Sequence, residues 1–236
     1  MNDRIAKQKL NIILLVDSSK SMCGNRIKQV DMAINDIKDY LVNLQNENAN
    51  VDFYLSIITF SNDAKFYKDV PFININDFSY DGIKCGGYSN LHCAYEKLGE
   101  ILTKESKGGI MPDFGGAAPV ILLLTDGHPT GNSYKDELEK IKNKPWYKVA
   151  LRYGIAIELD DKRTGSVLKD FVENNGDVIN CYDSSMLKNI IKIIVLTASK
   201  VKSTSANVSY ESSTDSQKNI KQMIAEALTD TDGWEW

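Results

Sequence analysis

A long apolar run is absent from this 236-residue sequence. The first nine residues, MNDRIAKQK, lack the apolar core of a secretory signal. No later segment reaches the roughly 20 apolar residues that a membrane-spanning helix needs. We therefore expect a cytoplasmic protein without a membrane partner.

Cysteine motifs are also absent. The four cysteines, Cys23, Cys85, Cys93 and Cys181, are scattered and form no C-x-x-C pair. Such spacing favours reduced thiols over a disulfide framework or a zinc site. For Cys23 we expect a packed structural thiol.

Excess positive charge is missing as well. The chain has 28 Lys and Arg against 32 Asp and Glu, a net charge of -4, which argues against a nucleic-acid partner. Only two histidines occur, and neither His92 nor His128 belongs to a catalytic triad motif. The loop GGIMPDFGG lacks the G-K-[ST] ending of a phosphate-binding loop.

What the sequence does contain is an alternation of strand and helix patterns. The unbroken apolar run Ile12 to Val16 is typical of a central strand that is buried on both faces of a parallel sheet. We predict an α/β fold, doubly wound, with a mainly parallel sheet, helices on both faces and one antiparallel edge strand. The edge strand is the segment 64–72, whose charges and Pro71 suit an edge.

The other expected elements follow the periodicity of apolar residues. They are a helix from Asn25 that ends within 43–50, a strand over 52–60, a helix over 90–103, a loop over 104–119, a strand over 120–125, a helix over 134–144 closed by Pro145, a strand over 148–158, a helix over 165–174, a strand over 178–181 and a helix over 184–198.

A cluster of oxygen-bearing side chains follows the first strand. Asp17 ends the strand, and Ser19 and Ser21 come at alternate positions, so the three side chains can point to one place. Ligands of open α/β sheets gather beyond the carboxyl ends of the strands. The simpler alternative is that these residues only cap the next helix.

Two further motifs favour a binding site. Ser89 follows a glycine-rich turn, and Asp126 ends the apolar run VILLLTDG. With D-x-S-x-S at Asp17, these motifs resemble the von Willebrand factor A family, whose metal-ion-dependent adhesion site combines the same three pieces. The resemblance spans roughly residues 10–198. We expect a domain over 1–199.

The resemblance implies a Mg²⁺ or Mn²⁺ site with a specific set of ligands and a specific partner. The ligands would be Asp17, Ser19, Ser21, Ser89 and Asp126. The ion would bind an Asp or Glu side chain of a protein partner, without catalysis. Family members commonly place two glycines before the Thr of the second loop. Here Gly87 and Tyr88 stand there, so Tyr88 itself remains an alternative for the Thr position.

Within the family, the motifs LSIITFSNDAK, SNLHCAY and LLLTDGHPT look most like the TerY-like, tellurite-resistance-associated branch. That branch implies a bacterial stress-response role, with a protein kinase or a protein phosphatase as partner. A second hypothesis is a metal-dependent phosphohydrolase with Asp17 as nucleophile. Ser19 stands where a haloacid-dehalogenase-like enzyme would need a second carboxylate.

The C-terminal segment 200–236 differs from the rest in composition. Residues 199–216 are rich in Ser, Thr, Asn and Lys, which is typical of a flexible linker. Apolar residues from Ile220 to Leu228 then recur at helical spacing, before a tail with two tryptophans around Glu235. We expect either a docking segment, with Glu235 a carboxylate ligand for a neighbouring molecule's metal, or a disordered terminus.

Overall fold

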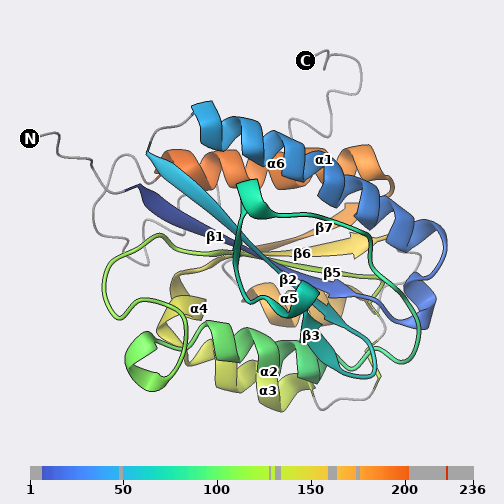
Figure 1. Ribbon diagram of the computed structural model, residues 1–236. Helices are drawn as coiled ribbons and strands as arrows, with labels where there is room; N and C mark the ends of the chain where they lie inside the picture. The colour runs from blue at the N-terminus through green and yellow to red at the C-terminus, as the bar shows by residue number, and fades with distance from the viewer. Residues whose placement is uncertain are drawn as a thin grey trace, which may run out of the picture.

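Strands and helices alternate along the chain. The strands form one sheet, and the helices cover both of its faces (Figure 1). The computed structural model describes residues 7–47, 50–127, 129–130, 134–158, 164–173 and 176–201, together with Gln222. The strand order is β3-β2-β1-β5-β6-β7, and β4 also pairs with β2. The strands are β1 (Gln8–Asp17), β2 (Val51–Phe60), β3 (Ala64–Phe66), β4 (Ile73–Asn74), β5 (Val120–Thr125), β6 (Leu151–Ile157) and β7 (Gly176–Cys181).

The helices form two layers. The α-helices are α1 (Asn25–Glu47), α2 (Leu91–Ile101), α3 (Tyr134–Lys142), α4 (Pro145–Val149), α5 (Thr164–Val172) and α6 (Ser184–Val201), and short 3₁₀ turns are η1 (Lys20–Met22), η2 (Tyr67–Asp69), η3 (Ile75–Asp77) and η4 (Glu105–Lys107). Figure 1 shows α1 and α6 side by side above the sheet, and α2 and α3 below it. The predicted doubly wound fold is confirmed.

β1 is the central strand and fixes where the functional site lies. It pairs in parallel with β2 from Gln8 to Asp17 and with β5 from Ile12 to Val16. Its apolar run is buried because each helical layer covers one face. Each such aliphatic side chain contributes about 1.5–3 kcal/mol through burial. The carboxyl ends of β1 and β5 therefore meet at one edge, on the right of Figure 1.

The antiparallel edge is shorter than the sequence predicts. Among the described residues, the short strands β3 and β4 are the ones that pair antiparallel with β2, instead of one strand over 64–72. Lys68 and Asp69 take φ values of 55° and 57°, which turn the chain out of the sheet.

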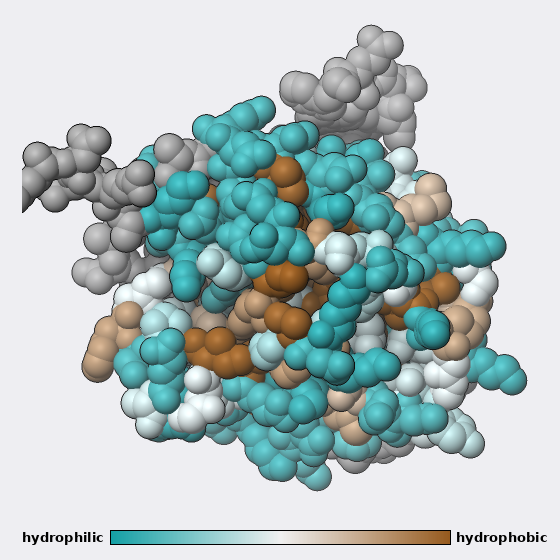
Figure 2. Space-filling view, in the orientation of Figure 1, coloured by the Kyte–Doolittle hydropathy of each residue, from teal (hydrophilic) through white to brown (hydrophobic). Residues whose placement is uncertain are grey.

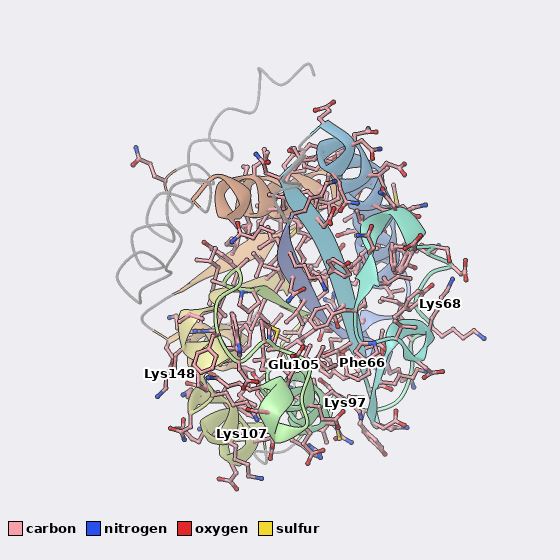
Figure 3. The ribbon with its side chains drawn as sticks, turned by 60° about the vertical axis from the view of Figure 1, so that its left-hand side comes forward. Phe66, Lys68, Lys97, Glu105, Lys107 and Lys148 are labelled. Atoms are coloured by element: carbon pink, nitrogen blue, oxygen red, sulfur yellow. A yellow bond between two sulfur atoms is a disulfide. The ribbon has the colours of Figure 1, made fainter. Side chains whose placement is uncertain are left out.

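Figure 3 shows Phe66 of β3 beside Lys97 of α2, whose ammonium lies 5.6 Å from the ring centroid. In Figure 2, hydrophobic atoms on this face gather between the two helical layers.

Element boundaries also differ near Pro145. The residue begins α4 instead of only closing the preceding helix, since proline is well tolerated in the first turn. β6 consequently starts at Leu151 and not at Lys148. Trp146 in α4 is buried, and its indole N–H donates to the Pro112 carbonyl at 3.0 Å. This bond holds the 104–119 loop against the helical layer.

The expectation of four reduced thiols is wrong. Cys23 and Cys85 form a disulfide, with their Cα atoms 5.5 Å apart. Cys93 and Cys181 are free. The paired cysteines are separated by 62 residues, so their proximity arises from the packing of two loops and leaves no spacing motif.

Some expectations concern parts of the chain beyond the described residues. His128 and nearly all of the 200–236 segment lie there, so the predicted linker, docking helix and Glu235 contact stay predictions. Among the described residues, no helix combines the length and apolar character needed to cross a membrane.

Candidate metal centre

Asp17 is the centre of the candidate site. Its side chain is fully buried at the end of β1 and accepts hydrogen bonds from three segments. The Ser19 backbone N–H donates to Oδ1 at 2.9 Å. The hydroxyls of Ser89 and Thr125 donate to Oδ2 at 2.9 and 2.7 Å. Asp17 therefore joins its own loop, the loop before α2 and the end of β5.

The D-x-S-x-S loop brings two hydroxyls together, as its spacing predicts. The Oγ atoms of Ser19 and Ser21 lie 3.1 Å apart. Lys20, between them, has an exposed side chain, and its backbone N–H donates to the Gly87 carbonyl at 3.0 Å. No side-chain cap bond forms from Ser19 to η1, so the capping alternative does not account for this serine.

In the second loop, the structure distinguishes between Ser89 and Tyr88. Ser89 is 4% exposed and contacts Asp17, whereas Tyr88 is 69% exposed on the rim. Thr130 fixes Ser89 from both sides, because its hydroxyl accepts from the Ser89 N–H and its own N–H donates to the Ser89 carbonyl at 2.7 Å. Asn62 Oδ1 accepts the Tyr88 N–H at 2.9 Å. The geometry favours Ser89 for the Thr position.

Asp126 lies on the same edge of the sheet, beside the side chain of Arg26, which no sequence motif indicates. Arg26 Nη1 lies 3.0 Å from Asp126 Oδ2 and donates to the Ser21 carbonyl at 3.1 Å. The guanidinium of Arg26 therefore bridges Asp126 and the backbone of the D-x-S-x-S loop. On its other side, Arg26 donates to the Glu158 carbonyl at 3.3 Å.

Glu158 anchors the beginning of α1. It follows β6 in a left-handed conformation, with φ of 48°. Its carboxylate accepts hydrogen bonds from Asn25 and Gln29 of α1. The first turns of α1, and Arg26 with them, are thus fixed relative to the sheet.

Burial makes the carboxyl group of Asp17 harder to ionise than a carboxyl group in water. Burial raises the pKa of its carboxyl above the ordinary value of 3.8, and the hydrogen bonds from Thr125, Ser19 and Ser89 only partly oppose this. No cationic side chain contacts Asp17 among the interactions of the described residues. A cation held nearby would favour the ionised form and remove this cost.

The donor atoms fit a hard divalent cation. Mg²⁺ takes about six oxygen ligands and usually keeps water where protein ligands are few. Asp17, Asp126 and three serine hydroxyls supply only oxygen. Among the described residues, no group of three or more His, Cys, Asp or Glu side chains could hold a metal. The candidate site therefore depends on its serines.

Sequence reasoning missed three residues of this site. Thr125 reads as the last residue of an apolar strand, although a polar residue beside Asp126 at a strand end is a usable signal. Arg26 and Glu158 carry no such signal, because Arg26 meets Asp126 across 100 positions and Glu158 across 132.

Comparison with known families matches this arrangement. The sequence pattern of the von Willebrand factor type A domain matches residues 11–193, which include most of β1, all of α1, every segment of the candidate site and the first part of α6. The chain belongs to the von Willebrand factor type A domain family. Such domains are typically metal-dependent protein-interaction modules.

One relative of this von Willebrand factor type A domain is a bovine protein. Inter-alpha-trypsin inhibitor heavy chain H4 of Bos taurus is 32% identical over 134 residues, which are 54% of this chain and 14% of that protein. The match therefore covers a small part of the relative, and the activity of the whole relative does not transfer.

Solved structures share the fold. The ArnB paralog VWA2 from Sulfolobus acidocaldarius has a TM-score of 0.55 at 22% identity, covering 78% of this chain and 44% of that one. Proximal thread matrix protein 1 from the mussel byssus gives 0.54 at 19%, covering 82% and 48%. A second structure of the mussel protein, at 0.52 and 18%, has a zinc-occupied MIDAS motif and covers 82% and 48%. The domain thus spans less than half of each of these chains.

Proposed function

We propose that this domain is a non-enzymatic, metal-dependent protein-interaction module that binds an Asp or Glu side chain of its partner. The observation that supports it is the convergence of Ser89 and Thr125, from two different segments, on the buried carboxylate of Asp17. The ion would be held by Asp17, Ser19, Ser21, Ser89 and Asp126. When bound, it would supply positive charge to an incoming carboxylate.

The rim of the site indicates what else the partner carries. Lys20 and Tyr88 both expose their side chains, and the Lys20 N–H bonds to Gly87, the residue before Tyr88. A lysine beside the site attracts a second acidic group. An exposed tyrosine on a backbone held by Asn62 suits a binding hot spot, because little entropy is lost on contact. The partner segment is therefore acidic, with an apolar or aromatic neighbour.

The competing hypothesis is a phosphohydrolase with Asp17 as nucleophile. Both carboxylate oxygens of Asp17 already accept hydrogen bonds, and the side chain is fully buried. At the position two residues on, where such an enzyme would carry a second carboxylate, the chain has Ser19. Activity of the metal-loaded protein on a panel of phosphoesters tests this alternative.

The biological setting rests on the resemblance alone. The TerY-like motifs support a bacterial stress response linked to tellurite resistance, with a protein kinase or phosphatase as partner. We retain the cytoplasm as the proposed location. Cytosolic disulfides are usually transient or redox-sensing, so this location bears directly on the Cys23–Cys85 bond.

Two measurements test the proposed function. Titration calorimetry with Mg²⁺, Mn²⁺ and Zn²⁺ should show one site that Asp17→Ala or Asp126→Ala removes; Zn²⁺ is included because the mussel protein's motif holds zinc. Pull-down from lysate with Mg²⁺ or with EDTA should recover a partner only with the metal. Recovery of the same partners in both conditions would exclude the metal-dependent mechanism.

A further inference from the structure

The Cys23–Cys85 disulfide connects the two loops that carry the site's serines. Cys23 comes two residues after Ser21, and Cys85 comes four residues before Ser89. The bond therefore lies beside the site without belonging to it. It is the covalent connection between two loops that are otherwise 62 residues apart in sequence.

The remaining connections between these loops are weak by comparison. The Gly86 N–H donates to the Ser18 carbonyl at 2.8 Å, and the Lys20 N–H donates to the Gly87 carbonyl at 3.0 Å. Between η3 and α2 the chain forms no helix or strand. Gly86 and Gly87 also take φ values of 149° and 83°, which glycine adopts readily. Asn62 holds the Tyr88 N–H and Thr130 holds Ser89, so the disulfide restrains mainly the segment from Cys85 to Gly87 that leads to Ser89.

The disulfide is also accessible. Cys23 is exposed and Cys85 is half-buried, so a dissolved thiol can reach the bond. Among the other two cysteines, Cys181 is fully buried, and burial raises the pKa of its thiol to about 12. Such a thiol is inert at neutral pH. Cys93 is half-buried, and burial also raises the pKa of its thiol, so neither free thiol competes readily for the Cys23–Cys85 bond.

We propose that Cys23–Cys85 is a thiol–disulfide exchange site whose substrate is a dithiol reductant, and that its redox state controls how firmly Ser89 is held against Asp17. One thiolate of the reductant attacks the Cys23 Sγ, the S–S bond breaks, and Cys85 leaves as a thiolate that takes up a proton. The second reductant thiolate attacks the mixed disulfide and releases Cys23. The protein gains two electrons and two protons, and the reductant becomes a disulfide.

Reduction has a defined structural result. The loop from Cys85 to Ser89 gains conformational freedom, while β1 and Asp17 remain fixed by pairing with β2 and β5. The hydroxyl of Ser89 then spends less time within reach of Asp17. The oxidised form is the binding-competent form, because its ligands are preorganised.

Hydrogen exchange on the metal-free full-length chain tests this without reference to function. After treatment with dithiothreitol, the amides of Lys20 and Gly86 should exchange at least about tenfold faster, whereas amides within β1 should not change. When the protein is reduced under native conditions, freed of dithiothreitol and then denatured for thiol titration, the count should rise from the two free thiols to all four cysteines. A count that stays at two, or unchanged exchange at Lys20 and Gly86, overturns the proposal.

Matched variants complete the test. Cys23→Ser combined with Cys85→Ser should show the fast exchange with or without reductant, and Cys93→Ser should behave as wild type. The link to metal rests on the proposed function: Mg²⁺ affinity should fall about three- to tenfold on reduction and return on reoxidation. If no metal binds in either state, the proposed function fails, and the exchange rates still decide the role of the disulfide.

Discussion

Arg26 lies between Asp126 and the backbone of Ser21, 3.0 Å from the Asp126 carboxylate and 3.1 Å from the Ser21 carbonyl. A protein cation thus contacts a proposed metal ligand. It neutralises part of the charge that Asp126 would offer to an ion. An ion bound at the proposed site would therefore be more electrophilic toward a partner's carboxylate, at the expense of affinity for the ion itself.

Replacing Arg26 should show whether its guanidinium competes with a metal ion for Asp126. We expect Arg26→Gln to tighten Mg²⁺ binding about threefold to tenfold, roughly 1 kcal/mol for a partly screened pair, and the gain should shrink in high salt. Calorimetry at two ionic strengths measures it. Lys28→Gln, an exposed residue of the same helix, is the control. Weaker binding in Arg26→Gln would mean that the guanidinium mainly orients Asp126.

Asp17 should reduce the stability of the metal-free protein. Asp17→Asn removes a buried negative charge while the hydroxyls of Ser89 and Thr125 can rotate to suit the amide. We expect unfolding of the metal-free protein to require on the order of 1 kcal/mol more, together with loss of Mg²⁺ binding. Urea titration and calorimetry check both effects. Asp63→Asn, an exposed loop residue, should change neither.

The stability difference between wild type and Asp17→Asn should depend on pH. Because burial raises the pKa of Asp17, the folded protein holds a proton that the unfolded chain has lost, between the ordinary value of 3.8 and the raised one. Wild-type stability therefore falls relative to the variant as pH rises through this window. The difference should vanish at low pH and level off above the window. A difference that is constant with pH would contradict the raised pKa.

Thr125 should matter through its hydroxyl alone. This group donates to Asp17 and accepts the Gly127 N–H at 2.9 Å. Thr125→Val keeps the β-branched shape but leaves that buried N–H without its acceptor, so we expect a loss of about 1–3 kcal/mol in stability and several-fold weaker Mg²⁺ binding. Thr125→Ser should restore metal affinity. If the serine variant behaves like the valine variant, side-chain packing is the important property.

Tyr88 should affect partner binding and not metal binding. Tyr88→Ala removes an exposed ring at the rim, and we expect partner affinity to fall by about 1–2 kcal/mol with unchanged Mg²⁺ affinity. Phe114→Ala is a matched control, because this ring is 90% exposed in the loop that precedes β5, at the other end of the strands. Equal losses from both variants would indicate a nonspecific effect of exposed aromatic rings.

The sequence predicts the fold well because its signals are local. The run Ile12 to Val16 and the helical stripe of α1 each follow from residues that are near neighbours in the chain. Asp17, Ser19 and Ser21 share one loop, so their spacing alone brings them together. Ser89 and Asp126 could be placed beside them only through the family resemblance, since spacing does not relate separate loops.

The features that sequence reasoning missed depend on tertiary packing. The ion pair of Arg26 with Asp126 and the bond of Cys23 with Cys85 join segments whose approach is set by the whole sheet. The prediction of the edge strand was wrong for another reason. Residues 64–72 have the composition of a strand, but Lys68 and Asp69 turn the backbone away, and the enrichment of Asp at positive φ is too weak a signal to place that turn.

The unbroken pairing of β1 with both neighbours makes this domain a candidate scaffold for engineered recognition. Asp17 is fixed at the end of a strand that cannot shift without breaking two ladders. Lys20 and Tyr88, in contrast, present their side chains outward from backbones that are already hydrogen-bonded. Randomising these two positions should yield libraries with new ligand preferences and an unaltered core.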